Sequence, residues 1–167
     1  DFAATGMIVD EDDALLLVNQ AQADAFFWGL ELETEATVFD NDYGLLDLRL
    51  WTDRVSGEFD DGANVPRLPP PRFGGALDWS RGAYYAQLAA TRTTEQDDLA
   101  ALETRTPGFT ELNVQVGYRV NVGDTELSLF ARGSNLLDET QRRHVSLVKD
   151  LAPRPGIAGL IGVRLRY

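Results

Sequence analysis

The sequence is poor in the residues that usually build metal, redox and disulfide sites. It has no cysteine and a single histidine among 167 residues, which excludes a disulfide framework and a thiolate metal site. Its longest aliphatic run, residues 14–18, is far too short for a transmembrane helix. Positive charge is also outnumbered: the formal net charge is −12, so we do not expect nucleic acid as a partner.

Residues 156–167 form a pattern with one apolar and one polar side. The polar side carries Arg164 and Arg166, and this alternation continues up to a terminal aromatic residue. The apolar side consists of Ile157, Ile161, Val163, Leu165 and Tyr167. A tilted transmembrane β-strand needs this pattern, because one face meets lipid and the other meets a polar lumen. The alternative is an amphipathic edge strand of a soluble β-protein.

The same alternation recurs along the chain and predicts an all-β protein of about eight strands. The expected strands are residues 2–9, 25–36, 44–56, 72–80, 83–93, 110–121, 125–135 and 157–167. The mean hydropathy of −0.22 is compatible with a membrane barrel, because only alternate residues meet lipid. The opposite face is charged, which predicts a wet or plugged lumen. Its charged residues are Glu31, Glu33, Asp47, Arg49, Asp53, Asp78, Arg119, Glu126, Arg132, Arg164 and Arg166.

Connections between the expected strands alternate between short and long. Short turns are expected near residues 40–42, 80–83 and 121–124, and long loops near 10–23, 57–71, 94–109 and 136–155. Outer-membrane barrels have short periplasmic turns and long extracellular loops. We therefore expect a girdle of membrane-interface aromatics beside the short turns and a second one near the long loops. The first girdle is Trp79, Tyr84, Tyr118 and Tyr167, and the second is Phe26, Trp28 and Phe73.

Several motifs resemble those of TonB-dependent outer-membrane receptors. Residues 131–139 resemble the "NLLD/NLFD" strand end of that family. Residues 143–156 are similar to the "R-H-x-S…K-D-x-A-P-x-P-G-R" close of a receptor subgroup that includes metal and siderophore uptake, although Ile157-Ala158 stand where that subgroup often has Arg-Asn. Residues 22–33 and 64–74 resemble its "G-x-E-x-E" strand and its proline-rich strand entry. The motif residues are Asn135, Leu136, Arg143, His144, Lys149, Asp150, Pro153, Pro155 and Gly156.

The resemblance implies that residues 1–167 are the C-terminal part of a barrel of about 22 strands in the bacterial outer membrane. The plug domain and the N-terminal strands are not expected in this sequence, which begins at Asp1 without a signal peptide. The implied function is TonB-energised uptake of a scarce nutrient such as a metal ion or metal chelate. The implied partners are outer-membrane lipids, the receptor's own plug and remaining strands, the TonB complex through the absent N-terminal part, and the barrel-assembly machinery through the terminal strand.

Two kinds of candidate site remain open. Asp10, Glu11, Asp12 and Asp13 in the first long loop could hold a hard cation, and His144 could face a substrate or metal. The competing interpretations are a solvated acidic loop and an ordinary loop histidine. His144, Ser146 and Asp150 also permit a catalytic triad in sequence, which would make the protein an outer-membrane enzyme. We expect a transporter segment with no resident cofactor and no catalytic residues, and a self-contained eight-stranded structural or adhesive barrel is the alternative.

Overall fold

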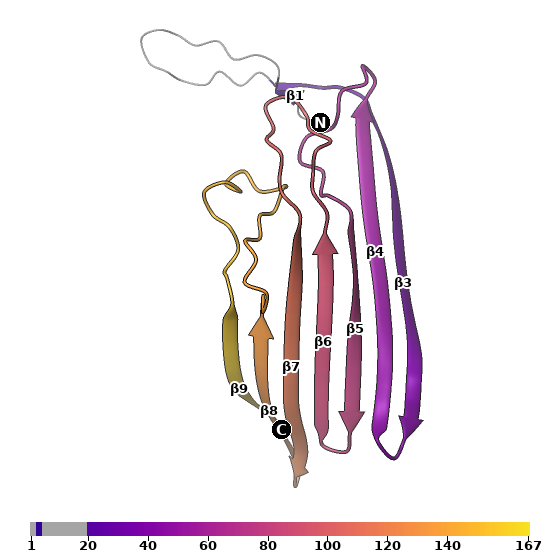
Figure 1. Ribbon diagram of the computed structural model, residues 1–167, viewed down its shortest axis with the longest axis vertical. Helices are drawn as coiled ribbons and strands as arrows, with labels where there is room; N and C mark the ends of the chain where they lie inside the picture. Colours follow the sequence, from indigo (N-terminus) through magenta and orange to yellow (C-terminus); the bar gives the residue numbers. More distant parts are fainter. Residues whose placement is uncertain (1–2, 5–19) are drawn as a thin grey trace.

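The computed structural model describes residues 3–4 and 20–167, and within them every regular element is a β-strand. Seven strands form one antiparallel sheet in chain order, each paired with the next (Figure 1). They are β3 (Ala25–Asn41), β4 (Gly44–Phe59), β5 (Arg72–Arg81), β6 (Tyr84–Thr93), β7 (Phe109–Val122), β8 (Thr125–Ser134) and β9 (Ala158–Arg166). The expected all-β antiparallel fold is confirmed. The described residues contain no helix long and apolar enough to cross a membrane.

The strand expected at residues 2–9 does not join this sheet in its described part. β1 (Ala3–Ala4) pairs instead with β2 (Gln20–Ala21) in a separate two-stranded sheet. The rest of that expected strand lies outside the described residues.

Short turns and long loops lie at opposite ends of the sheet. The β3–β4, β5–β6 and β7–β8 turns all lie at the lower end of the sheet in Figure 1, and the long connections lie at the upper end. Gly82 and Gly123 occupy the first central position of two of the short turns with φ of 55° and 61°. Type II′ hairpin turns need positive φ at that position, which glycine adopts without steric cost. Local turn chemistry therefore fixes these two registers.

β3 and β4 are longer than the sequence pattern predicted. The predicted strand at 25–36 continues to Asn41, and its pairing with β4 shifts register between Thr37 and Phe39. A bulge of this kind places one extra residue, here Val38, against the partner strand. The extra residue breaks the period-two pattern, so alternation alone ended the strand too early.

The sheet has an apolar face and a polar face, as the alternation predicted. Most apolar-face side chains have no protein cover: Ile161 is 86% exposed and Phe73 is 54% exposed. By strand register, the charged residues of the apolar face within β3–β9 are Arg54, Glu58, Arg81 and Arg92, all toward the strand ends. On β6, Tyr84 and Arg92 are eight residues apart, or about 26 Å along the strand. An uncharged outward band of this height matches the lipid-facing belt of a transmembrane barrel.

The sheet does not close on itself within the described residues. β3 and β9 are its two edges, and each pairs on one side only. The expected open sheet is confirmed in this part of the chain.

Candidate functional site

The aromatics expected beside the short turns lie together on the apolar face. Trp79 Nε1 in β5 donates a hydrogen bond at 3.0 Å to the carbonyl oxygen of Tyr43 in the β3–β4 turn. Tyr84 and Tyr118 are register partners whose rings meet edge to face at 5.0 Å. Tyr167 follows β9 and is fully exposed. Their role as membrane-interface residues stays a prediction that this placement favours.

Two arginines and several aromatics mark the opposite, long-loop boundary of the apolar face. The guanidinium of Arg54 lies 5.3 Å from the centroid of the Trp28 ring. Arg92 Nη1 donates to Thr110 Oγ1 at 3.1 Å, and Phe73 lies beside Arg92 in register. Amphipathic rings and arginines that can reach headgroups are common at such a boundary.

Aromatic side chains on the polar face lie over glycines of the neighbouring strand. Five register pairs join an aromatic to a glycine: Phe27–Gly57, Trp51–Gly74, Tyr85–Gly117, Phe130–Gly117 and Phe130–Gly162. A Cβ on Gly74 would approach the Trp51 ring to 2.6 Å, and a Cβ on Gly117 or Gly162 would overlap the ring above it. The rings therefore lie against the sheet rather than projecting away from its polar face.

Hydrogen bonds join the three long loops of the described region. Asn64 Nδ2 donates to the Leu99 carbonyl at 3.1 Å, and Gln96 Nε2 donates to the Leu68 carbonyl at 2.9 Å. The last loop is joined through Thr104, whose Oγ1 donates to Asp150 Oδ2 at 3.3 Å. The segments 60–71, 94–108 and 135–157 thus form one packed unit above the sheet.

The only histidine and the only lysine of the chain meet in this unit. Lys149 Nζ donates to Thr106 Oγ1 at 2.8 Å and to the Thr104 carbonyl, and Thr106 Oγ1 lies 2.8 Å from His144 Nδ1. On the other side of the ring, His144 Nε2 is 3.5 Å from Glu103 Oε1. Because the Lys149 ammonium can only donate, Thr106 Oγ1 accepts its hydrogen bond and donates its own hydroxyl proton to His144 Nδ1. Nδ1 is therefore an acceptor, and the imidazole proton sits on Nε2, facing the Glu103 carboxylate. We call Glu103, Thr106, His144 and Lys149 the loop cluster.

Burial and charge shift the pKa values of this cluster. Burial lowers the pKa of His144 below its usual value, and the neighbouring Lys149 charge lowers it further, whereas Glu103 acts in the opposite direction. Partial burial acts to raise the pKa of Glu103, but backbone N–H donors of Ala100 and Arg67 and the nearby imidazole lower it overall. His144 is therefore neutral and Glu103 ionised at neutral pH.

The two family-like motifs meet at the base of the last loop. Asn135, at φ 50°, donates through Nδ2 to the carbonyls of Glu139 at 3.0 Å and Pro155 at 3.3 Å. Asp138 Oδ1 accepts from the Ile157 amide at 2.9 Å, and a Cβ on Gly156 would crowd that carboxylate. The motif residues at 135–138 and 155–157 therefore fasten the two ends of the loop just before β9.

The comparisons with known proteins agree with this geometry. The family model described as "TonB dependent receptor-like, beta-barrel" matches residues 3–136. This chain belongs to that family. It is therefore part of a bacterial outer-membrane protein. Among solved structures, the chain is similar to the copper transporter OprC, with a TM-score of 0.75 and 20% identity over 86% of this chain and 24% of OprC. The chain thus spans about a quarter of the length of that protein.

The metal candidates of this receptor barrel remain candidates. Asp10, Glu11, Asp12 and Asp13 lie outside the described residues. His144 is 4% exposed and its Nδ1 is already engaged, so in this arrangement it does not face an open binding surface. Within residues 3–4 and 20–167, no group of three or more histidine, cysteine or carboxylate side chains is placed to hold a metal ion.

The remaining motif residues have structural contacts. Arg143 accepts a backbone bond from Ser146 at 3.0 Å, and Asp150 Oδ2 accepts from Thr104 Oγ1 at 3.3 Å. The ring of His144 bonds to Thr106 rather than to Ser146 or Asp150. The triad that the sequence permits is therefore not assembled in the described loops. Pro153 lies exposed in the same loop.

Sequence reasoning missed the partners of His144 and the glycines beneath the aromatics. Glu103 and Thr106 lie about forty residues away along the chain, and only the packing of two loops brings them to His144. The glycines did carry a signal, because Gly74, Gly117 and Gly162 fall on the polar face by parity. Their pairing with rings required the strand register.

Proposed function

We propose that this chain is the C-terminal part of the barrel of a TonB-dependent receptor that takes up a metal ion or a metal chelate. Its membership in the barrel family is the observation that carries the proposal. The open sheet supports a part of a larger barrel, because an unpaired strand edge is costly in lipid and needs a partner strand. On this proposal the plug domain and the remaining strands are supplied by the rest of the receptor.

A metal as cargo has two supports. The similarly folded OprC is a copper transporter. This chain also offers a run of four carboxylates, residues 10–13, in a segment that the sequence places in a long loop. Carboxylate oxygens are the ligands that hard divalent cations prefer, whereas copper favours imidazole and sulfur, so a hard divalent ion fits these residues better than copper does.

The experiment measures uptake and binding separately in the receptor that carries this chain. Cells that express it should accumulate the labelled metal or chelate only when the TonB complex is present. Replacing Asp10, Glu11, Asp12 and Asp13 with Asn or Gln should weaken metal binding by about tenfold or more in calorimetry, which corresponds to about 1.4 kcal/mol. The matched control replaces Asp60 and Asp61, another acidic loop pair, with Asn. TonB-independent accumulation would contradict the proposed function. Equal metal affinity in all variants would indicate that residues 10–13 are a solvated acidic loop rather than a metal site.

A further inference from the structure

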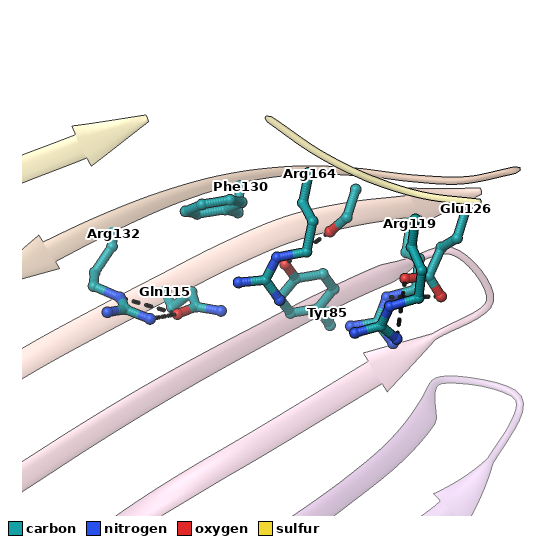
Figure 2. A pocket seen from close by; sticks show the side chains of 9 residues that line it. Tyr85, Gln115, Arg119, Glu126, Phe130, Arg132 and Arg164 are labelled. Atoms are coloured by element: carbon teal, nitrogen blue, oxygen red, sulfur yellow. Dashed lines mark hydrogen bonds and ion pairs between the residues drawn. The ribbon is translucent and has the colours of Figure 1, made fainter. Parts of the chain in front are cut away.

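The polar face of the last three strands carries a small hollow lined by arginines. The hollow measures about 150 Å³, and the arginines come from β7, β8 and β9 (Figure 2). They are Arg119, Arg132, Arg164 and Arg166. We call this space the basic hollow. It lies toward the short-turn end of the sheet, because Arg119 stands close to the β7–β8 turn.

The basic hollow keeps most of its positive charge. Within the described residues a single carboxylate lines it, that of Glu126, which lies 3.8 Å from Arg119 and 4.0 Å from Arg166. Four guanidinium groups against one carboxylate leave three positive charges. Arg132 is hydrogen-bonded to a neutral side chain, and Arg164 has no hydrogen bond or ion pair with any residue that the structure describes. An anion that enters the hollow therefore meets arginines that no carboxylate of the sheet neutralises.

The rest of the lining adds hydrogen-bond donors. Strand register places Ser128 directly between Arg119 and Arg164, in one row across β7, β8 and β9. Ser128 is buried, and its hydroxyl lies 3.5 Å from that of Tyr85, so at least one of the two hydroxyl protons can turn to a ligand. Gln115 accepts an arginine bond through Oε1, which leaves its amide N–H groups for another acceptor. A ligand rich in acceptor oxygens matches this lining.

The size and the apolar surface of the basic hollow favour a small anion. Sites for drug-sized molecules usually enclose roughly 300–1,000 Å³, which is more than this hollow offers. The rings of Tyr85 and Phe130 line it and lie over glycines of the neighbouring strands. Apolar surface beside the charges lowers the local dielectric and strengthens the attraction of an anion. A bare metal cation would be repelled by the same charges.

We propose that the basic hollow binds a phosphate group. Phosphate carries more than one negative charge near neutral pH and presents several acceptor oxygens. The planar guanidinium fork matches these oxygens with paired N–H···O bonds. Arg119 and Arg164 would hold the group from two sides, with the Ser128 hydroxyl between them. The group can belong to free inorganic phosphate or to a phosphate monoester. The site goes beyond the proposed function, because it needs neither a metal nor energised transport.

The test measures phosphate binding to the full receptor in detergent solution. Calorimetry with inorganic phosphate alone should show saturable binding that weakens as sodium chloride is added, because salt screens charges that are open to solvent. Arg119→Gln with Arg164→Gln should weaken binding at least about tenfold, since bonds to a charged group are lost. The matched control, Arg54→Gln with Arg92→Gln, removes the same charge from the apolar face and should leave the affinity unchanged. Heat-modifiable mobility on a gel confirms that each variant folds.

A further variant separates a shaped site from a general positive field. Arg164→Lys keeps the charge but loses the planar fork, so phosphate affinity should fall severalfold. Absence of binding to the full receptor, equal losses in the two double variants, or unchanged affinity in Arg164→Lys would overturn the inference. Glycerol phosphate in place of inorganic phosphate identifies the source. Tighter binding of the monoester would indicate the phosphate group of a larger molecule, and tighter binding of inorganic phosphate would indicate the free anion.

Discussion

At the scale of single residues, His144 has a clear structural assignment. Its ring lies between the Lys149–Thr106 pair and the Glu103 carboxylate, and it is 4% exposed. These contacts join the loop before β7 to the loop before β9. We therefore assign His144 and Lys149 a structural role, which is to hold these two loops together. This role does not depend on what the receptor binds.

The loop cluster should weaken in mild acid. When the loops open, His144 regains its usual pKa of about 6.5, whereas in the closed loops its pKa is lower. Below about pH 6.5 the open state takes up a proton that the closed state excludes, so stability is lost as pH falls. Glu103 does not contribute in this range, because its own pKa lies below its usual value.

Hydrogen exchange between about pH 7.5 and pH 5.5 measures this effect, after correction for the intrinsic pH dependence of exchange. Amides of the loops at 94–108 and 135–157 should exchange severalfold faster at the lower pH. The variant His144→Gln should remove the difference, because an amide side chain does not titrate. An equal acid response in this variant would assign the effect to another group.

At the scale of elements, pairs of aromatic and glycine residues organise the polar face. Gly117 pairs with Tyr85 on one side and with Phe130 on the other, and Phe130 in turn pairs with Gly162. This row crosses four strands, and each ring covers backbone that a glycine leaves bare. Such cross-strand pairs stabilise the sheet and pin its register.

Adding a methyl group beneath a ring should destabilise the barrel. In Gly117→Ala the new Cβ would overlap the Tyr85 ring, and overpacking of this kind costs about 1–3 kcal/mol. Urea unfolding of the receptor in detergent should show a lower midpoint, and adding Tyr85→Ala should restore part of the loss. Gly159→Ala is the control, because its nearest neighbour atom would be 4.0 Å from the Cβ. Equal midpoints for Gly117→Ala and Gly159→Ala would refute the account.

At the scale of the whole molecule, the sheet has an uncovered apolar face and two unpaired edges. The buried apolar side chains of the described region are few, Ala76 and Phe109, so a dry protein core contributes little to its stability. Lipid must cover the apolar face, and partner strands must complete β3 and β9. The larger membrane barrel that we propose would meet both requirements.

The chain expressed alone with an export signal should therefore not form a stable barrel. Its two edges would leave backbone N–H and C=O groups without partners in lipid, at several kcal/mol for each group. The outer-membrane fraction should lack a heat-modifiable, protease-resistant species, whereas the full receptor provides one. A stable monomeric barrel from this chain alone would favour the self-contained eight-stranded alternative.

The strand class, the two faces and the sidedness of the connections can be read from the sequence alone. Period-two alternation, as in Leu127, Leu129 and Ala131 against Arg132, depends only on neighbours in the chain, and turn glycines such as Gly123 act locally. Tertiary structure decided what depends on register and loop packing. The Val38 bulge, the ring of Tyr85 over Gly117 and the contact of Glu103 with His144 join residues that no local pattern connects. Four arginines of the polar face depend on both: parity set the direction of Arg119, Arg132, Arg164 and Arg166, and strand pairing gathered them into one hollow.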